Sequence, residues 1–88
     1  MAQARSDEER VLKLIERTRL LIALDDEIPV EIKLNTQPML KMLEGELTSG
    51  CIDEQRASAM YGALYRDLDK YPDIEALLGA MRVFLTYL

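Results

Sequence analysis

The 88 residues are enough for one domain with one modest core, which excludes a second domain. Hydrophobic residues make up 49% of the chain and charged residues 31%, a balance typical of a folded soluble protein. The formal net charge of −5 argues against nonspecific nucleic-acid binding, because that binding depends on lysine and arginine neutralising phosphates.

The sequence also lacks the usual targeting and membrane signals. The longest apolar run, Leu20 to Leu24, is far short of the ~20 residues that span a bilayer. Acidic residues at positions 7–9 interrupt the N-terminus before any apolar segment, unlike a signal peptide. Cys51 is the single cysteine and cannot form an internal disulfide. We therefore expect a cytoplasmic protein without a membrane span.

The chain lacks the residues that most enzyme mechanisms require. There is no histidine, which removes the commonest general base and the usual metal ligand. Cys51 has no histidine partner, so we expect a buried or half-buried structural thiol. The four glycines are scattered and form no phosphate-binding loop. We expect no enzyme activity and no catalytic, metal-binding or cofactor-binding residues.

Residues 1–5 lack a pattern and are expected to fray, whereas Ser6 and Glu9 form a capping box that predicts the start of a first helix. Glu9 and Lys13 are spaced for a surface ion pair. The apolar residues of this helix recur at helical spacing: Val11, Leu14, Ile15, Thr18, Leu21 and Ile22, with Leu12, Leu20 and Leu24 broadening the stripe.

Charges distinguish the polar side and the end of the first helix. Arg10, Lys13 and Arg17 form a basic line that is either a solvated face or a contact for an acidic partner. Three acids follow at positions 25–27, where the helix dipole favours cations. We expect this end to fray or to be capped by a neighbouring lysine or arginine.

The segment from residue 28 to residue 35 is ambiguous. Apolar and polar residues alternate strictly from Val30 to Leu34, which predicts an extended or strand-like link. A competing interpretation makes Pro29 the first residue of a helix that continues to a kink at Pro38. We favour a fresh helix start near Asn35, with Pro38 in the first turn and Gly50 closing the helix.

Two apolar-striped helices complete the chain from Asp53, the predicted N-cap, and meet at Tyr71 and Pro72. Gly62 and Gly79 lie inside them, either because the two backbones approach closely there or as tolerated glycines on an exposed face. The first stripe contains Ala57, Met60, Tyr61, Leu64, Leu68 and Tyr71, and the second contains Ile74, Leu77, Leu78, Met81, Leu85 and Leu88.

The run from Val30 to Leu68 resembles the ribbon-helix-helix family, with VEIKL as the ribbon and Gly50 at the turn between two helices. The resemblance implies a dimeric DNA-binding regulator that inserts its ribbon into the major groove, with Glu31, Lys33 and Asn35 facing bases. The layout of IPVEIKL, MLKMLEGELTSG, ALYRDLDKYP and a last helix is similar to small acidic four-helix immunity proteins of bacteriocin producers. That resemblance implies a non-catalytic inhibitor.

We predict an all-α fold, a small antiparallel bundle of about four helices in a single domain, with the strand-like link at residues 28–35. The apolar stripes are wider than such a bundle needs, which points to a protein partner or to a homodimer. The expected function is a non-catalytic protein–protein interaction module, such as an inhibitor, immunity protein, secretion chaperone or anti-factor. The alternative is a ribbon-helix-helix regulator with residues 30–34 as ribbon. The predicted partner-binding residues are Tyr65, Met81, Phe84, Leu85, Tyr87 and Leu88.

Overall fold

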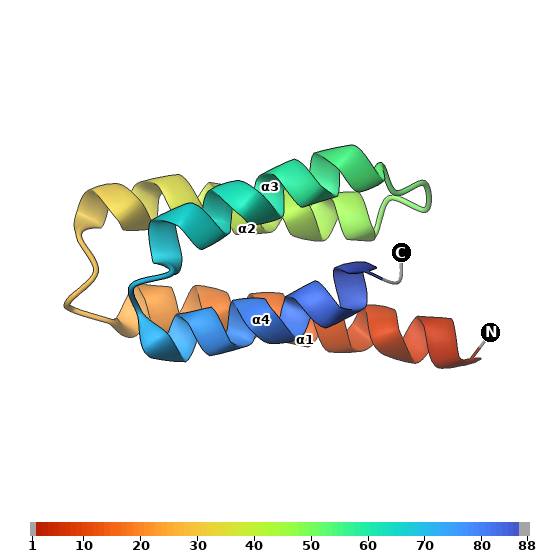
Figure 1. The fold of residues 1–88 in the computed structure, drawn as a ribbon, viewed down its shortest axis with the longest axis horizontal. Helices are drawn as coiled ribbons and strands as arrows, with labels where there is room; N and C mark the ends of the chain where they lie inside the picture. The colour runs from red at the N-terminus through yellow and green to blue at the C-terminus, as the bar shows by residue number, and fades with distance from the viewer. Residues whose placement is uncertain (1, 87–88) are drawn as a thin grey trace.

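The computed structural model describes the backbone of residues 2–86 and the side chains of residues 8–85. Its helices are α1 (Ala2–Leu24), α2 (Val30–Leu47), α3 (Glu54–Leu68) and α4 (Pro72–Thr86), as labelled in Figure 1. Residues 2–86 contain no strand. None of the helices within these residues is long and apolar enough to cross a membrane.

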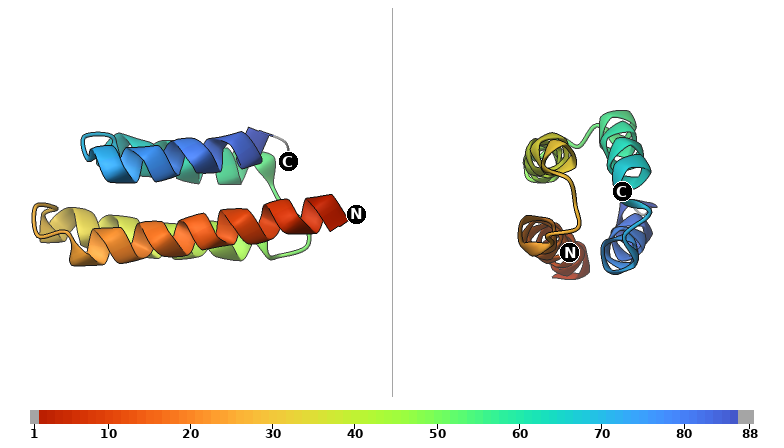
Figure 2. Two further views of the ribbon diagram at one scale, coloured as in Figure 1. Left: turned by 90° about the horizontal axis from the view of Figure 1, so that it is seen from below. Right: turned by 90° about the vertical axis from the view of Figure 1, so that its left-hand side faces the viewer.

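The four helices form an antiparallel bundle. Each helix packs against two neighbours: α1 and α3 both contact α2 and α4. Successive helices run in opposite directions (Figure 1), and the end view in Figure 2 places them at the corners of a square. The links at residues 25–29 and 69–71 lie at one end, and the link at residues 48–53 lies at the other. The predicted all-α bundle of four helices is therefore confirmed.

One shared core holds the bundle together. The helical stripes that the sequence predicts for α1, α3 and α4 face it, and burial of such stripes supplies most of the stability of short helices. Its buried apolar residues are Val11, Ile15, Ile22, Ile28, Leu40, Leu43, Leu47, Ala57, Leu64, Leu68, Ile74, Leu78 and Met81. Thr18 and Thr36 are also fully buried, and each hydroxyl donates to a backbone carbonyl one turn earlier in its own helix, at 2.7 Å.

The predicted strand-like link at residues 28–35 is wrong. Pro29 ends the link with φ −58° and ψ 146°, and its carbonyl accepts bonds from the backbone N–H groups of Ile32 and Lys33. The helix therefore begins at Val30 and runs through Pro38, as the competing interpretation stated. Since residues 30–34 are helical, the chain does not form the ribbon that the ribbon-helix-helix alternative requires.

The alternation of apolar and polar residues from Val30 to Leu34 led to a wrong prediction because, over five residues, it fits a helix as well as a strand. Ile32 packs against the core, while Val30 and Leu34, one turn apart, are exposed on the outer side of α2. Thr36, next to the helix start predicted near Asn35, continues the buried side one turn after Ile32.

Predictions about the helix ends had mixed outcomes. The Asp53 N-cap is confirmed, because its carboxylate accepts from the backbone N–H of Arg56 at 3.1 Å. Lys33 caps α1 by donating to the carbonyl of Ala23 at 3.2 Å. The start predicted at Ser6 is wrong, since α1 already begins at Ala2. Cys51 is exposed in the α2–α3 link, which corrects the expected buried or half-buried thiol.

Of the two interpretations of Gly62 and Gly79, the close approach is wrong and the exposed position is confirmed. A Cβ atom built at either position meets no neighbouring atom within 4 Å, and both residues are exposed. Gly50 differs from them because its φ of +84° lies in the left-handed region, which favours glycine in the α2–α3 link.

Gly62→Ala and Gly79→Ala should therefore each raise the free energy of unfolding by about 0.5–1 kcal/mol, because alanine restricts the unfolded chain and favours helix. Urea unfolding of the single variants measures the change. Gly50→Ala is the contrasting variant and should lower stability by about 1 kcal/mol, because its backbone is left-handed. Destabilisation by the first two variants would restore a packing role for these glycines.

Candidate functional site

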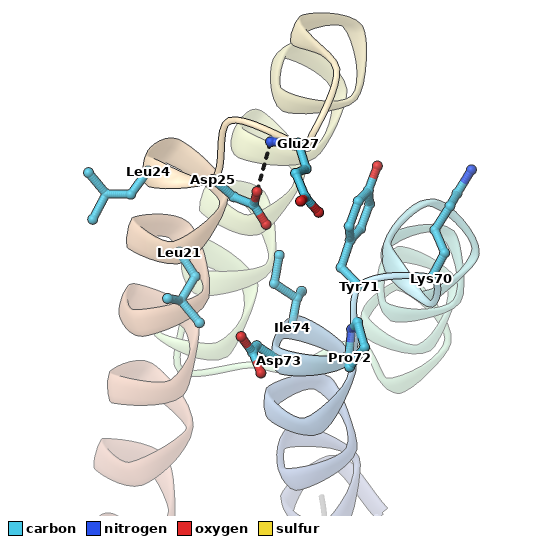
Figure 3. Close-up of a pocket in the computed structure, with 9 residues that line it drawn as sticks. All are labelled: Leu21, Leu24, Asp25, Glu27, Lys70, Tyr71, Pro72, Asp73 and Ile74. Carbon is cyan, nitrogen blue, oxygen red and sulfur yellow. Dashed lines mark hydrogen bonds between the residues drawn. The ribbon is translucent and has the colours of Figure 1, made fainter.

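A hollow of about 420 Å³ opens at the end of the bundle, where the α1–α2 link meets the start of α4 (Figure 3). Side chains from both links surround it, and Leu24 points away from it. Its lining residues are Leu21, Leu24, Asp25, Glu27, Lys70, Tyr71, Pro72, Asp73 and Ile74.

The polar side chains of this end hollow do not converge on one point. The Asp25 carboxylate accepts from the backbone N–H of Glu27 at 2.9 Å, so it is engaged in shaping the link. Among the described residues, no group of His, Cys, Asp and Glu side chains could hold a metal ion. The hollow therefore presents scattered carboxylates and one lysine without a common focus.

A larger groove of about 700 Å³ lies on the outer side of the α1/α2 pair. Two large apolar side chains that line it are mostly exposed, Leu20 by 57% and Leu34 by 68%. One turn along the same helices, Leu24 is exposed by 76% and Val30 by 69%. We call these four residues, together with the groove lining, the α1/α2 face. The lining consists of Glu16, Arg19, Leu20, Ala23, Lys33, Leu34, Gln37 and Pro38.

Two side chains of α2 donate hydrogen bonds to the backbone of α1 in this groove. The Gln37 amide N–H donates to the carbonyl of Arg19 at 2.8 Å, and Lys33 donates to the carbonyl of Ala23. The Arg19 guanidinium also donates to the Gln37 side-chain oxygen, at 3.4 Å. Since donors and acceptors are both one helical turn apart, the bonds join the helices at two successive levels. They leave the groove with few polar groups to offer a ligand.

A third groove, of about 430 Å³, lies between α1 and α4. It brings the basic line predicted on α1 together with an apolar floor, and we call it the basic groove. Its lining consists of Arg10, Lys13, Leu14, Arg17, Ala80 and Phe84. The ion pair predicted between Glu9 and Lys13 is not formed in the structure.

The structure separates the predicted partner-binding residues. Phe84 is half-buried and lines the basic groove, and Leu85 is half-buried against the core. Met81 is fully buried, so its side chain offers no surface to a partner. Tyr65 lies on α3 with its ring stacked on Tyr61, at a centroid distance of 6.2 Å. Tyr87 and Leu88 lie outside the described residues.

The exposed apolar residues of the α1/α2 face were missed as site residues. Leu20 and Leu24 were assigned to a broadened core stripe, and Val30 and Leu34 to a strand. A helical interpretation of residues 30–34 would have placed Val30 and Leu34 one turn apart on one side, which is the signal that could have found them.

Tyr61 joins α3 to α4, because its hydroxyl donates to the carbonyl of Leu78 at 2.7 Å. Burial raises the pKa of Tyr61 above its ordinary value of 10.0, with Arg82 opposing and Tyr65 adding to the increase. The neutral phenol is thus the form that the folded state favours.

The chain matches no protein-family model, no curated protein and no solved structure. Its function therefore has to be argued from the surfaces described above.

Gln37→Ala should lower the free energy of unfolding by about 1 kcal/mol, because it removes the bonds to Arg19 from a partly buried seam. Urea unfolding measures this loss. Gln55→Ala, at an exposed position of α3, is the matched control and should change stability by less than ~0.5 kcal/mol. Equal effects of the two variants would contradict a role for the Gln37 bonds.

Tyr61→Phe should be destabilising at neutral pH, and the difference from wild type should shrink as the pH rises above 10.0. The folded state binds the phenol proton more tightly than the unfolded chain does. The stabilisation by the Tyr61 hydroxyl is therefore fully present below the pKa that Tyr61 has in the unfolded chain, and it is lost as the pH rises through the higher pKa of the folded state. Urea unfolding at about pH 8 and about pH 11 tests the change. Tyr65→Phe is the control, because it keeps the Tyr61 hydroxyl. A difference that does not vary with pH would refute this linkage.

Proposed function

We propose that this chain is a non-catalytic protein–protein interaction module of the cytoplasm, whose α1/α2 face binds an amphipathic helix of a partner protein. The observation that carries the proposal is a groove of about 700 Å³ lined by the exposed Leu20 and Leu34. The exposed Leu24 and Val30 lie one turn along the same two helices and extend its apolar surface. Contiguous apolar surface on a small protein is characteristic of interaction sites.

The shape of the α1/α2 face favours a helix as its occupant. Two antiparallel helices leave a seam between them, and amphipathic helices bind such grooves through side chains spaced three or four residues apart. Because Gln37 and Lys33 already bond α1, recognition in this groove depends mainly on apolar contact.

The size of the face argues against a second copy as its main occupant. From Val30 to Pro38 it extends about 12 Å along α2, at ~1.5 Å per residue. Adjacent helix axes are ~8–10 Å apart, so the patch covers much less than the ~800 Å² that each partner contributes to a stable interface. A short segment of another protein can fill it completely.

The proposed class includes inhibitors, immunity proteins, secretion chaperones and anti-factors. Each acts by occupying or shielding a surface of its partner, which requires a stable helical scaffold and an exposed apolar face but no catalytic group. The α1/α2 face replaces the final helix as the proposed partner-binding surface.

Leu34→Glu should weaken partner binding at least tenfold, because the complex would have to desolvate a carboxylate in an apolar groove. Leu34 is 68% exposed, so the free energy of unfolding should change by less than ~0.5 kcal/mol. Val83→Glu is the matched control, since Val83 is exposed on α4 outside this face.

The partner can be found by photo-crosslinking in cell extract. The probe is attached through Leu34→Cys, or through Val83→Cys as control, each in a Cys51→Ser background. Peptide mapping should place the crosslink from position 34 on an amphipathic helix of one protein, and that protein then serves for the affinity measurements. A second copy of the chain at position 34, no crosslink beyond the control, or unchanged affinity in the Leu34→Glu variant would each refute the proposal.

A further inference from the structure

The basic groove is separate from the α1/α2 face, and it is lined by cations as well as apolar side chains. Three cations of α1 line one side: Arg10, Lys13 and Arg17. Leu14 and Phe84 contribute apolar surface, while Ala80 has a small side chain on the α4 side. The groove, of about 430 Å³ in all, thus combines positive charge with apolar surface.

The three cations are exposed and unpaired within the described part of the chain. No ion pair or hydrogen bond joins Arg10, Lys13 or Arg17 to another described side chain. No carboxylate among residues 8–85 pairs with them, so their charges can act on a ligand.

The positive charge of this groove contrasts with the charge of the rest of the sequence. Residues 8–24 contain four basic and three acidic residues, whereas residues 25–86 contain six basic and twelve acidic residues. The rest of the bundle is thus strongly acidic and α1 is not. An acidic ligand is attracted to the groove and repelled elsewhere, which gives the complex a preferred orientation.

The spacing of the cations fits a helical ligand. Arg10, Lys13 and Arg17 follow the i, i+3, i+7 pattern of one helix side and span about 10 Å along α1. A second helix lying along α1 can present three carboxylates at matching intervals. An apolar side chain next to these carboxylates would then fill the recess at Ala80 beside Phe84.

We propose that the basic groove binds an acidic amphipathic helix of a protein partner, which places carboxylates against the three cations and one apolar anchor over Ala80. Nucleic acid fits less well. Its phosphates would gain from the cations but leave the apolar floor unused, and the acidic remainder of the chain would repel a polyanion. The inference does not depend on the α1/α2 face, because the two surfaces share no lining residue.

The probe is a fluorescein-labelled synthetic helix with glutamates at i, i+3 and i+7 and leucines on the adjacent side. Fluorescence anisotropy with the intact chain should show saturable binding that weakens at least tenfold between about 20 mM and about 200 mM salt. Peptides with glutamine in place of glutamate, or alanine in place of leucine, should each bind at least tenfold more weakly.

Protein variants locate the site. Lys13→Glu should weaken binding at least tenfold by charge reversal, and Ala80→Leu should do the same by filling the recess without changing the charge. Lys41→Glu, at an exposed lysine of α2, has the same charge change and should leave affinity within twofold of wild type. Leu34→Glu should also leave it unchanged, which separates this site from the α1/α2 face.

Several results would overturn the inference. Absence of saturable peptide binding would do so, and so would equal losses from Lys13→Glu and Lys41→Glu, which would indicate general charge attraction. Preference for the glutamine peptide, or tighter binding of labelled oligothymidylate than of the acidic peptide, would likewise refute an acidic helix as the ligand.

Discussion

The rest of the structure depends on the burial of four apolar stripes in one shared core. Helices in proteins draw most of their stability from tertiary packing, so each of these helices of 15–23 residues needs its two neighbours. The helices stand at the corners of a square (Figure 2), and all four contribute buried apolar residues to the shared core, while large apolar residues on the outer sides stay exposed. The candidate sites consequently lie along seams between adjacent helices or where links meet, because only there do side chains from two elements converge.

Polar groups add direction to this apolar packing. Apolar contact is non-directional, whereas a hydrogen bond weakens steeply when its geometry changes. Gln37 fixes α2 against α1, and Tyr61 fixes α4 against α3. Thr18 and Thr36 bring hydroxyls into the core without leaving them unpaired, since each bonds its own helix. The bundle thus obtains its inter-helix alignment from a few bonds at its seams.

Much of the fold could be predicted from sequence because helical periodicity is strong over long segments. The stripes of α1, α3 and α4, the Asp53 cap and the break before Pro72 all follow from local rules. The prediction for residues 30–34 failed because five residues fit both the strand period and the helix period. Only the packing of Ile32 against the core decides between a strand and a helix. The site could not be predicted in the same way. Whether Leu20 and Leu34 are covered depends on which helices pack beside them, which is a property of the assembled bundle.

Helix α1 combines two kinds of recognition chemistry because it contacts α2 on one side and α4 on the other. Leu20 and Ala23 border the seam with α2, while Arg10 and Lys13 border the seam with α4. Apolar contact depends on burial and acts only at short range, whereas charge acts over about 10 Å at ordinary ionic strength. An acidic partner would thus be oriented by the basic groove before any apolar surface is buried. This order of events favours specificity, since an acidic partner whose carboxylates do not match the basic groove is repelled by the acidic remainder of the bundle.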